Sequence, residues 1–249
     1  GDRTSLDLPA PQQNLLERLV ATGTPVVLVL INGSALSVNW ADEHVPAIIE
    51  AWYPGGQGGD AVARAIAGDI SPAGRLPVTF YRSVDDLPPF SDYDMSNRTY
   101  RYFAGEVLYP FGYGLSYTTF EYDNARLSNQ RVRADGLIEI TADVTNTGER
   151  DGDEVVQLYL SRREIQGMPL RSLVGFERIH LKSGETRKLR YTLEGSALSS
   201  VDVDGVRRIT PGIVDLWMGG GQPDRRKGLP PVAGIQVTFD VTSSATLAK

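Results

Sequence analysis

The chain has 249 residues, of which 41% are hydrophobic, so it is long enough for two domains with packed cores. Its net charge of −6, with no block of Lys or Arg, argues against nucleic acid or an anionic membrane surface as a partner. With no cysteine and only two histidines, thiolate chemistry is excluded, and a multi-histidine metal site or a Ser–His–Asp triad is disfavoured.

The first part of the chain is predicted to be an α/β layer. Residues 10–22 carry leucines at helical spacing, and the β-branched run 25–31 suits a strand that is buried on both faces. This run is also the longest apolar stretch, far short of the roughly 18–20 residues that a membrane span needs. A second helix over 60–68 and a second strand over 74–81 complete an alternation that indicates an α/β layer over about 5–82.

Two segments without regular periodicity follow. Residues 82–103 are polar and aromatic, and so long an irregular segment is typical of a functional loop or a wrapping connector. Residues 109–122 (YPFGYGLSYTTFEY) are dense in aromatic rings and carry a single charge, Glu121. Such rings can stack on sugars or fasten two domains together. We favour fastening, because the stretch runs directly into a predicted strand.

From about residue 124 the pattern is all-β. Alternating runs are separated by turn signals rich in Gly, Asp and Asn, and they predict five to seven short antiparallel strands. A sandwich of immunoglobulin or fibronectin III type is the leading architecture. The organisation that we expect is an α/β part over 1–108, an aromatic connector over 109–123, an all-β sandwich over 124–240 and a tail over 241–249.

One glycine-rich motif raises the question of a dinucleotide cofactor. Residues 56–61 (GQGGDA) fit the pattern G-x-G-x-x-G/A and precede a predicted helix. However, Asp60 lies where the helix N-terminus would receive a phosphate, and no lysine follows. We therefore interpret the motif as a turn that lets strand and helix pack closely, with Asp60 as the N-cap.

Acidic residues in the long polar segment raise the question of an ion site. Residues 92–103 have Asp, Asp and Ser at their first, third and fifth positions, like a calcium loop. The sixth position is Asn97 rather than Gly and the twelfth is Phe103 rather than Glu, which excludes an EF-hand and leaves only a looser ion site open. The adjacent pair Asp85 and Asp86 is better explained as solvated than as an acid–base pair. Taken alone, the residues form no catalytic constellation.

Several motifs, in order, carry a family resemblance. They are GRLPVTFY (74–81), RTYRYF (98–103), LYPFGYGLSY (108–117), VTNTGERDGDEVVQLYLS (144–161) and PLRSLVGFERIHLKSGE (169–185). In this order they resemble the C-terminal portion of glycoside hydrolase family 3, most closely its bacterial β-xylosidase-like members. The last two are similar to the fibronectin III-like module that ends many of these enzymes. The resemblance covers nearly the whole chain.

The resemblance implies a plan of barrel, α/β sandwich domain and fibronectin-like module, with the active site between barrel and α/β domain. It implies a retaining hydrolysis, in which an aspartate of the barrel attacks the anomeric carbon and a glutamate of the α/β domain acts as acid, then base. The barrel is absent here, and that glutamate lies shortly before the GDR motif with which this chain begins. No residue here therefore inherits a catalytic role. We expect a partial α/β domain, processed or excised from something longer and inactive by itself.

The expected function is that of the C-terminal portion of an exo-β-glycosidase, β-xylosidase before β-glucosidase, that trims oligosaccharides. Its implied partner is the barrel-containing N-terminal part of the same enzyme, as another chain or segment, with no nucleic acid, membrane, metal or organic cofactor. Tyr93, Arg98 and Tyr100 in the long polar segment are candidate substrate-binding residues. A periplasmic or secreted location is expected from a polymer-derived substrate.

Two other functions stay open. A stand-alone carbohydrate-binding or adhesion module would hold xylan or cellulose by itself, whereas an enzyme fragment would hold little until its barrel partner is added. A dinucleotide-binding oxidoreductase would require NAD to raise the melting temperature, and we expect no such shift.

Overall fold

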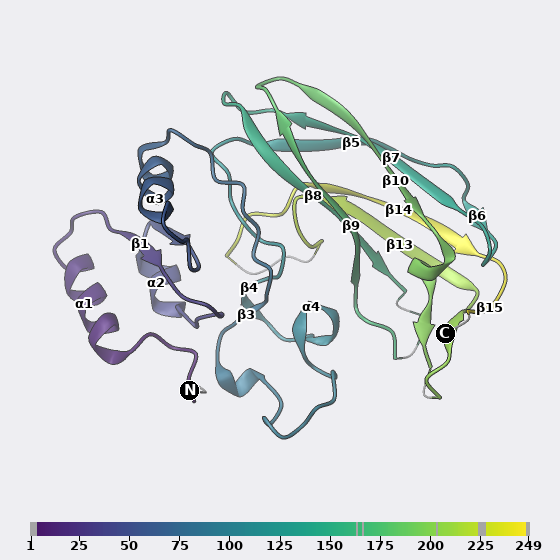
Figure 1. Ribbon diagram of the computed structural model, residues 1–249, viewed down its shortest axis with the longest axis horizontal. Helices are drawn as coiled ribbons and strands as arrows, with labels where there is room; N and C mark the ends of the chain where they lie inside the picture. The colour runs from purple at the N-terminus through teal and green to yellow at the C-terminus, as the bar shows by residue number, and fades with distance from the viewer. Residues whose placement is uncertain (1–3, 163, 166, 203, 224–227, 248–249) are drawn as a thin grey trace.

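The chain forms an N-terminal α/β layer followed by a β-sandwich (Figure 1), as the sequence predicts. This computed structural model describes residues 4–162, 164–165, 167–202, 204–223 and 228–247.

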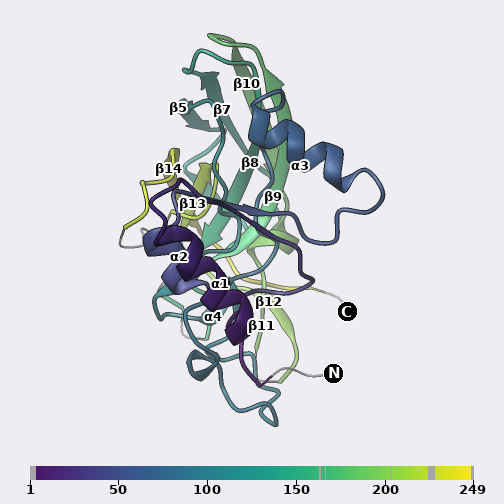
Figure 2. The same cartoon turned by 90° about the vertical axis from the view of Figure 1, so that its left-hand side faces the viewer.

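The α/β layer is built on a parallel pair of strands. Its elements are α1 (Ala10–Val20), β1 (Val27–Leu30), α2 (Asn39–His44), β2 (Ala47–Glu50) and α3 (Gly58–Ala67). β1 and β2 pair in parallel, with Val27 opposite Ala47. Helix α1 lies on the side of the layer away from the sandwich (Figures 1 and 2). The helix predicted over 10–22 and the strand predicted over 25–31 are confirmed as α1 and β1. The expected burial of that strand on both faces is wrong, because Val27 is exposed and Leu30 is the one buried residue of β1.

The N-cap predicted for the helix after the glycine-rich motif is wrong. Helix α3 begins at Gly58, so Asp60 lies in its first turn and not at the N-cap. There the Asp60 carboxylate lies 3.9 Å from the Arg64 guanidinium one turn later, a surface ion pair of the i,i+4 type. The helix ends as expected at Gly68, whose φ of 79° is the left-handed conformation that glycine adopts readily.

The segment 74–81 is a strand only at its end. β3 (Phe80–Tyr81) pairs antiparallel with β4 (Val107–Tyr109). Just before β3, Pro77 has no N–H to donate to a ladder. Leu76 instead pairs with the aromatic connector: its N–H donates to the Tyr113 carbonyl over 2.9 Å, and its carbonyl accepts from the Gly112 N–H over 2.7 Å. This pairing fixes the connector against the α/β layer.

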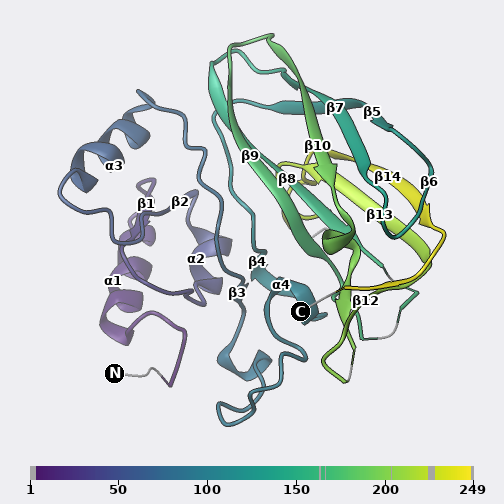
Figure 3. The same cartoon turned by 45° about the vertical axis from the view of Figure 1, so that its right-hand side comes forward.

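β3 and β4 form the base of a long loop, residues 82–106. The loop contains a 3₁₀ turn, η1 (Val84–Asp86), and a short helix, α4 (Thr99–Tyr102). Figures 1 and 3 show β3, β4 and α4 between the helices of the α/β layer and the sandwich. The loop is therefore placed to contact both parts of the molecule.

The sandwich packs a three-stranded sheet, in the order β10–β7–β5, against a five-stranded sheet, β6–β14–β13–β8–β9. The strands are β5 (Phe120–Leu127), β6 (Arg131–Val132), β7 (Ile138–Asn146), β8 (Gly152–Ser161), β9 (Ser172–Leu181), β10 (Thr186–Leu193), β13 (Gly212–Gly219) and β14 (Gly234–Val241). After the 3₁₀ turn η2 (Gly195–Leu198), the strands β11 (Ser200–Val201), β12 (Arg207–Ile209) and β15 (Ala245–Thr246) form a small third sheet. The described residues thus hold more strands than the five to seven expected, and β15 falls within the region expected to be a tail.

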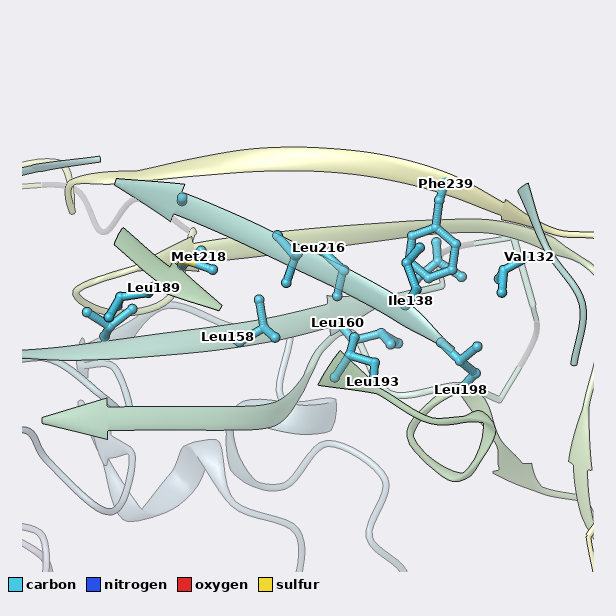
Figure 4. Packing of buried hydrophobic residues seen from close by; sticks show 14 of the residues in the cluster. Val132, Ile138, Leu158, Leu160, Leu189, Leu193, Leu198, Leu216, Met218 and Phe239 are labelled. Atoms are coloured by element: carbon cyan, nitrogen blue, oxygen red, sulfur yellow. The ribbon is translucent and has the colours of Figure 1, made fainter. Parts of the chain in front are cut away.

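The core of the sandwich follows the alternation in the sequence. In β7, every second side chain from Ile138 to Asn146 is buried. Leu158, Leu216 and Phe239 of the other sheet pack in the same core (Figure 4). Burying one such side chain completely contributes about 1.5–3 kcal/mol, so this core is the main source of the sandwich's stability.

The α/β layer, in contrast, leaves part of its apolar surface uncovered. Leu15 and Leu19 on α1 and Val27 and Ile31 at the two ends of β1 are exposed. The parallel sheet of the described residues has only two strands, although parallel sheets are normally covered on both faces and extended at their edges. An α/β layer with exposed apolar side chains and a two-stranded sheet is what we expect of the partial α/β domain that the resemblance implies.

Candidate functional site: a domain junction and the loop that it holds

The aromatic stretch 109–122 joins the two parts of the molecule. The Tyr109 hydroxyl donates to the Asp42 carboxylate on α2 over 2.6 Å. At the other end of the stretch, the Tyr122 hydroxyl donates to the Glu154 carboxylate on β8 over 2.7 Å. Each of these bonds anchors one end of the stretch in its own part of the molecule. Between them, the Gly112 N–H donates to the Leu76 carbonyl of the α/β layer over 2.7 Å, and the Gly112 carbonyl accepts from the Gln157 side chain of β8 over 3.0 Å. The stretch therefore fastens the α/β layer to the sandwich, which is the role favoured from the sequence.

Two glycines in this stretch allow close approach of the backbone. A Cβ on Gly112 would overlap the Gln157 side-chain amide of the sandwich, and Gly112 also has a φ of +79°. A Cβ on Gly114 would overlap the carbonyl oxygen of Gly74 in the α/β layer. No larger residue fits at either position without a shift of the neighbouring chain.

A buried ion pair crosses the junction. Arg75 extends from the α/β layer so that its Nη2 lies 2.6 Å from Glu154 Oε2, and the two side chains are 9% and 3% exposed. The Arg75 Nε–H donates to the Gly220 carbonyl over 3.0 Å. Burial raises the pKa of Glu154 above its usual value, and the charge of Arg75 and the Tyr122 hydroxyl partly offset that rise. Both charges are therefore held in place by partners from the opposite part of the molecule.

The three candidate substrate-binding residues lie on the long loop, in different surroundings. Tyr93 is 89% exposed, and nearby Phe90 is 86% exposed. The Arg98 guanidinium donates to the main-chain carbonyls of Asp92, over 2.6 Å, and of Pro89, over 3.2 Å. Arg98 therefore closes the loop on itself, and the two exposed rings are carried by the closed segment.

Tyr100 faces the sandwich instead of solvent. Its ring stacks on Phe111, with the ring centroids 4.2 Å apart, and its hydroxyl accepts a hydrogen bond from the Leu173 N–H over 3.2 Å. The structure thus gives Tyr93, Arg98 and Tyr100 separate surroundings. Their role as substrate-binding residues stays a prediction.

The acidic side chains of the loop are used in local turns. Asp92 accepts the Asp94 N–H over 2.9 Å, and Asp94 accepts the Ser96 N–H over 2.6 Å. The Ser96 hydroxyl and N–H lower the pKa of the Asp94 carboxyl. Within the part of the chain that the structure describes, no three His, Cys, Asp or Glu side chains are grouped so that they could hold a metal ion.

A cleft of about 840 Å³ lies where the loop meets the sandwich. One wall comes from the loop, with Phe103 and Glu106, and the other from the sandwich, with Leu170 and Arg171. Clefts of this size at domain boundaries commonly receive ligands. The sequence analysis did not identify this cleft, because its walls are far apart in the chain and no short pattern joins them.

Glu50 is a partly buried carboxyl that the sequence analysis also missed. It ends β2, at the carboxyl edge of the parallel pair, where sites in α/β sheets are commonly found. Its Oε1 accepts the Trp52 N–H over 3.0 Å, and burial raises its pKa. Trp52 has a φ of 53°, which is uncommon for so bulky a residue. β2 has only four residues, so its pattern was too short to identify this edge.

The two parts of the chain match two known domain families. Residues 1–117 match the Glycosyl hydrolase family 3 C-terminal domain, and residues 154–222 match the Fibronectin type III-like domain. A xylan 1,4-beta-xylosidase of Xylanibacter ruminicola is 42% identical over 227 residues, which cover 90% of this chain and 26% of that protein. A periplasmic beta-glucosidase of Salmonella typhimurium is 38% identical over 232 residues, which cover 88% of this chain and 30% of that protein.

Solved structures show the same arrangement. Beta-glucosidase 3B of Thermotoga neapolitana, in complex with alpha-D-glucose, matches with a TM-score of 0.86 at 26% identity, over 100% of this chain and 36% of that one. A beta-glucosidase of Kluyveromyces marxianus matches with a TM-score of 0.86 at 29% identity, over 98% of this chain and 30% of that one. The chain thus spans about a quarter to a third of the length of these proteins.

The fold and the junction define a partial α/β domain fastened to a fibronectin III-like sandwich. The chain belongs to glycoside hydrolase family 3, and it corresponds to the C-terminal portion of the family's enzymes.

Proposed function

We propose that this chain is the C-terminal portion of a retaining exo-β-glycosidase that removes terminal sugars from oligosaccharides, with β-xylosidase activity favoured over β-glucosidase activity. The observation that carries the proposal is the family 3 C-terminal domain followed by the fibronectin III-like domain. Relatives named as xylan 1,4-beta-xylosidase and beta-xylosidase, at 42% and 41% identity, support the preference for xylose. The nucleophile and the acid/base residue would be supplied from upstream of this chain.

The partner in this proposal is the barrel-containing N-terminal part of the same enzyme. The exposed apolar side chains Leu15, Leu19, Val27 and Ile31 support it, because an incomplete α/β layer would bury them against its missing strands and helices. The open edges of the β1–β2 pair offer main-chain groups for further strands. Upstream residues would therefore complete this layer as well as supply the catalytic acids.

The location that we propose is periplasmic or secreted. One relative, at 38% identity, is named a periplasmic beta-glucosidase, and oligosaccharides derived from polymers arise outside the cytoplasm. In the described residues, no helix is long and apolar enough to cross a membrane. Fractionation of the native cells would test the location: activity confined to the cytoplasm would contradict it.

The test of the function is reconstitution. The chain is joined to, or expressed with, the upstream region of its own protein, and hydrolysis of nitrophenyl β-xyloside and nitrophenyl β-glucoside is measured. We expect turnover only in the reconstituted sample, with the larger kcat/KM for the xyloside and a product that keeps the β configuration. Inactivity of a folded, reconstituted sample on both substrates would overturn the proposal.

A second candidate is a stand-alone carbohydrate-binding module, because the exposed rings of Phe90 and Tyr93 are available to stack on sugars. In that case the isolated chain would sediment with insoluble xylan or cellulose, and replacing both rings by alanine would abolish the binding. We expect little binding by the isolated chain, since a site wall contacts the substrate on one side only.

A further inference from the structure

The sandwich holds helix α4 of the long loop by hydrogen bonds, two of which go to main-chain carbonyls of the helix. The Leu170 N–H donates to the Arg101 carbonyl over 2.7 Å, and the Arg171 guanidinium donates to the Tyr100 carbonyl over 2.9 Å. Together with the Leu173 N–H on the Tyr100 hydroxyl, these bonds tie helix α4 to the start of β9. Three successive contacts of this kind leave α4 little freedom to move relative to the sandwich.

A second anchor joins the same turn to the aromatic connector. The Gln222 Oε1 accepts from Arg171 over 2.9 Å, and its Nε2 donates to the Phe111 carbonyl over 2.6 Å. The Phe111 ring in turn stacks on Tyr100. Gln222 is buried, so these bonds are shielded from competition with water. Arg171 is the residue that connects both anchors.

The backbone at the first residue of α4, Thr99, is strained. Thr99 has a φ of 55° and Asn97 a φ of 54°. A β-branched residue in this left-handed region is an outlier that persists only where the surroundings impose it. The Thr99 N–H is held by the Tyr81 hydroxyl over 2.8 Å, and the next residue, Tyr100, is held by the sandwich. The contacts that impose the strain therefore come partly from the sandwich.

We infer that Arg171 is a positioning residue: through α4 it sets the conformation of residues 84–98, and with it the placement of Phe90 and Tyr93. The fibronectin III-like domain then influences substrate recognition by positioning the loop, although none of its described residues needs to touch the sugar. The effect that we expect on substrate binding rests on the proposed function, whereas the effect on the conformation of the loop does not.

Hydrogen exchange of the 249-residue chain tests the structural part. The variant is Arg171→Ala, and the matched control is Arg190→Ala, an exposed arginine on β10 outside the junction. We expect amide exchange in residues 84–98 to accelerate about tenfold in Arg171→Ala while exchange in β7 and β13 stays unchanged. The control should change neither. Equal exchange of the loop in both variants would overturn the inference.

A milder variant tests the same inference if Arg171→Ala does not fold. Tyr100→Phe removes only the hydroxyl that accepts the Leu173 N–H, so the ring and its stacking remain. We expect an acceleration of about threefold in the same amides. If Arg171→Ala does not fold, unchanged loop exchange in Tyr100→Phe would overturn the inference by itself.

The reconstituted enzyme tests the catalytic part. We expect Arg171→Ala to raise KM for nitrophenyl β-xyloside about fivefold with kcat changed less than about twofold. A merely structural role would lower the active fraction and hence kcat, with KM unchanged, and that result would contradict positioning. If the parent enzyme shows no turnover, the proposed function fails, while the exchange experiment still decides whether Arg171 holds the loop.

Discussion

Removing Arg75 should destabilise the chain strongly, because its carboxylate partner would remain buried without a counter-charge. Arg75 Nη2 lies 2.6 Å from Glu154, whose side chain is 3% exposed. Breaking such a buried pair from one side typically costs about 3–5 kcal/mol, whereas an exposed pair contributes about 0–1 kcal/mol. Arg75→Ala should therefore lower the free energy of unfolding by about 3–5 kcal/mol. Arg190→Ala, which breaks an exposed pair with Glu139, should lower it by less than about 1 kcal/mol.

The pH dependence of the Arg75→Ala variant gives a sharper signature. Burial already raises the pKa of Glu154, and Arg75 is the main group that opposes this rise. A carboxyl whose pKa is raised by folding stabilises the folded state below its unfolded pKa, near 4.5, and that stability is lost as the pH rises through the folded pKa. As the pH rises above the unfolded pKa, the variant should therefore lose stability more steeply than the parent chain.

Urea denaturation at several pH values measures both effects. The double variant Arg75→Met with Glu154→Leu, which removes both charges, should recover most of the loss and abolish the added pH dependence. A cost below about 1 kcal/mol for Arg75→Ala, or a double variant no more stable than the single one, would refute the reasoning.

Four further predictions concern packing and the junction. Gly114→Ala should cost about 1–3 kcal/mol, because its Cβ meets a carbonyl oxygen. Its control is Gly56→Ala, which has open space around it and should change the free energy of unfolding by less than about 0.5 kcal/mol. Equal urea midpoints for these two variants would contradict the prediction for Gly114. Leu216→Ala in the sandwich core should cost about 2–5 kcal/mol. Leu15→Ala should cost the isolated chain less than about 1 kcal/mol but weaken reconstitution with the upstream region, measured by titration. Tyr122→Phe should cost about 1–3 kcal/mol by leaving a buried carboxylate one donor short. Tyr122 has a pKa raised well above 10.0, so the parent chain should also lose stability above pH 10, a loss that this variant should lack.

The helices and strands whose buried side chains recur at a regular spacing could be predicted from the sequence. The alternation in β7 and the leucines of α1 each determine a buried face directly, so strand and helix were found near their observed bounds. β1 and β2 both have four residues, but β1 lies in an unbroken apolar run over 25–31, whereas the run that contains β2 is shorter and ends at Glu50, so β2 was missed. The N-cap of α3 was wrong because the glycines before Asp60 already adopt helical geometry.

The junction could be predicted only in outline. The density of rings in 109–122 indicated a fastening role, but the partner of Arg75 lies in another domain, and no spacing rule connects it with Glu154. Arg98 was predicted to bind substrate, and in the structure its guanidinium donates to main-chain carbonyls of its own loop. Every residue offers a carbonyl, so the sequence gives no sign of which ones a guanidinium will select.

The most direct measurement of the central claim is hydrolysis of nitrophenyl β-xyloside by the purified chain before and after the upstream region is added. The account predicts no turnover from the chain by itself and hydrolysis once both are present. Turnover by the 249 residues alone, abolished by replacing one of their own carboxylates, would contradict it.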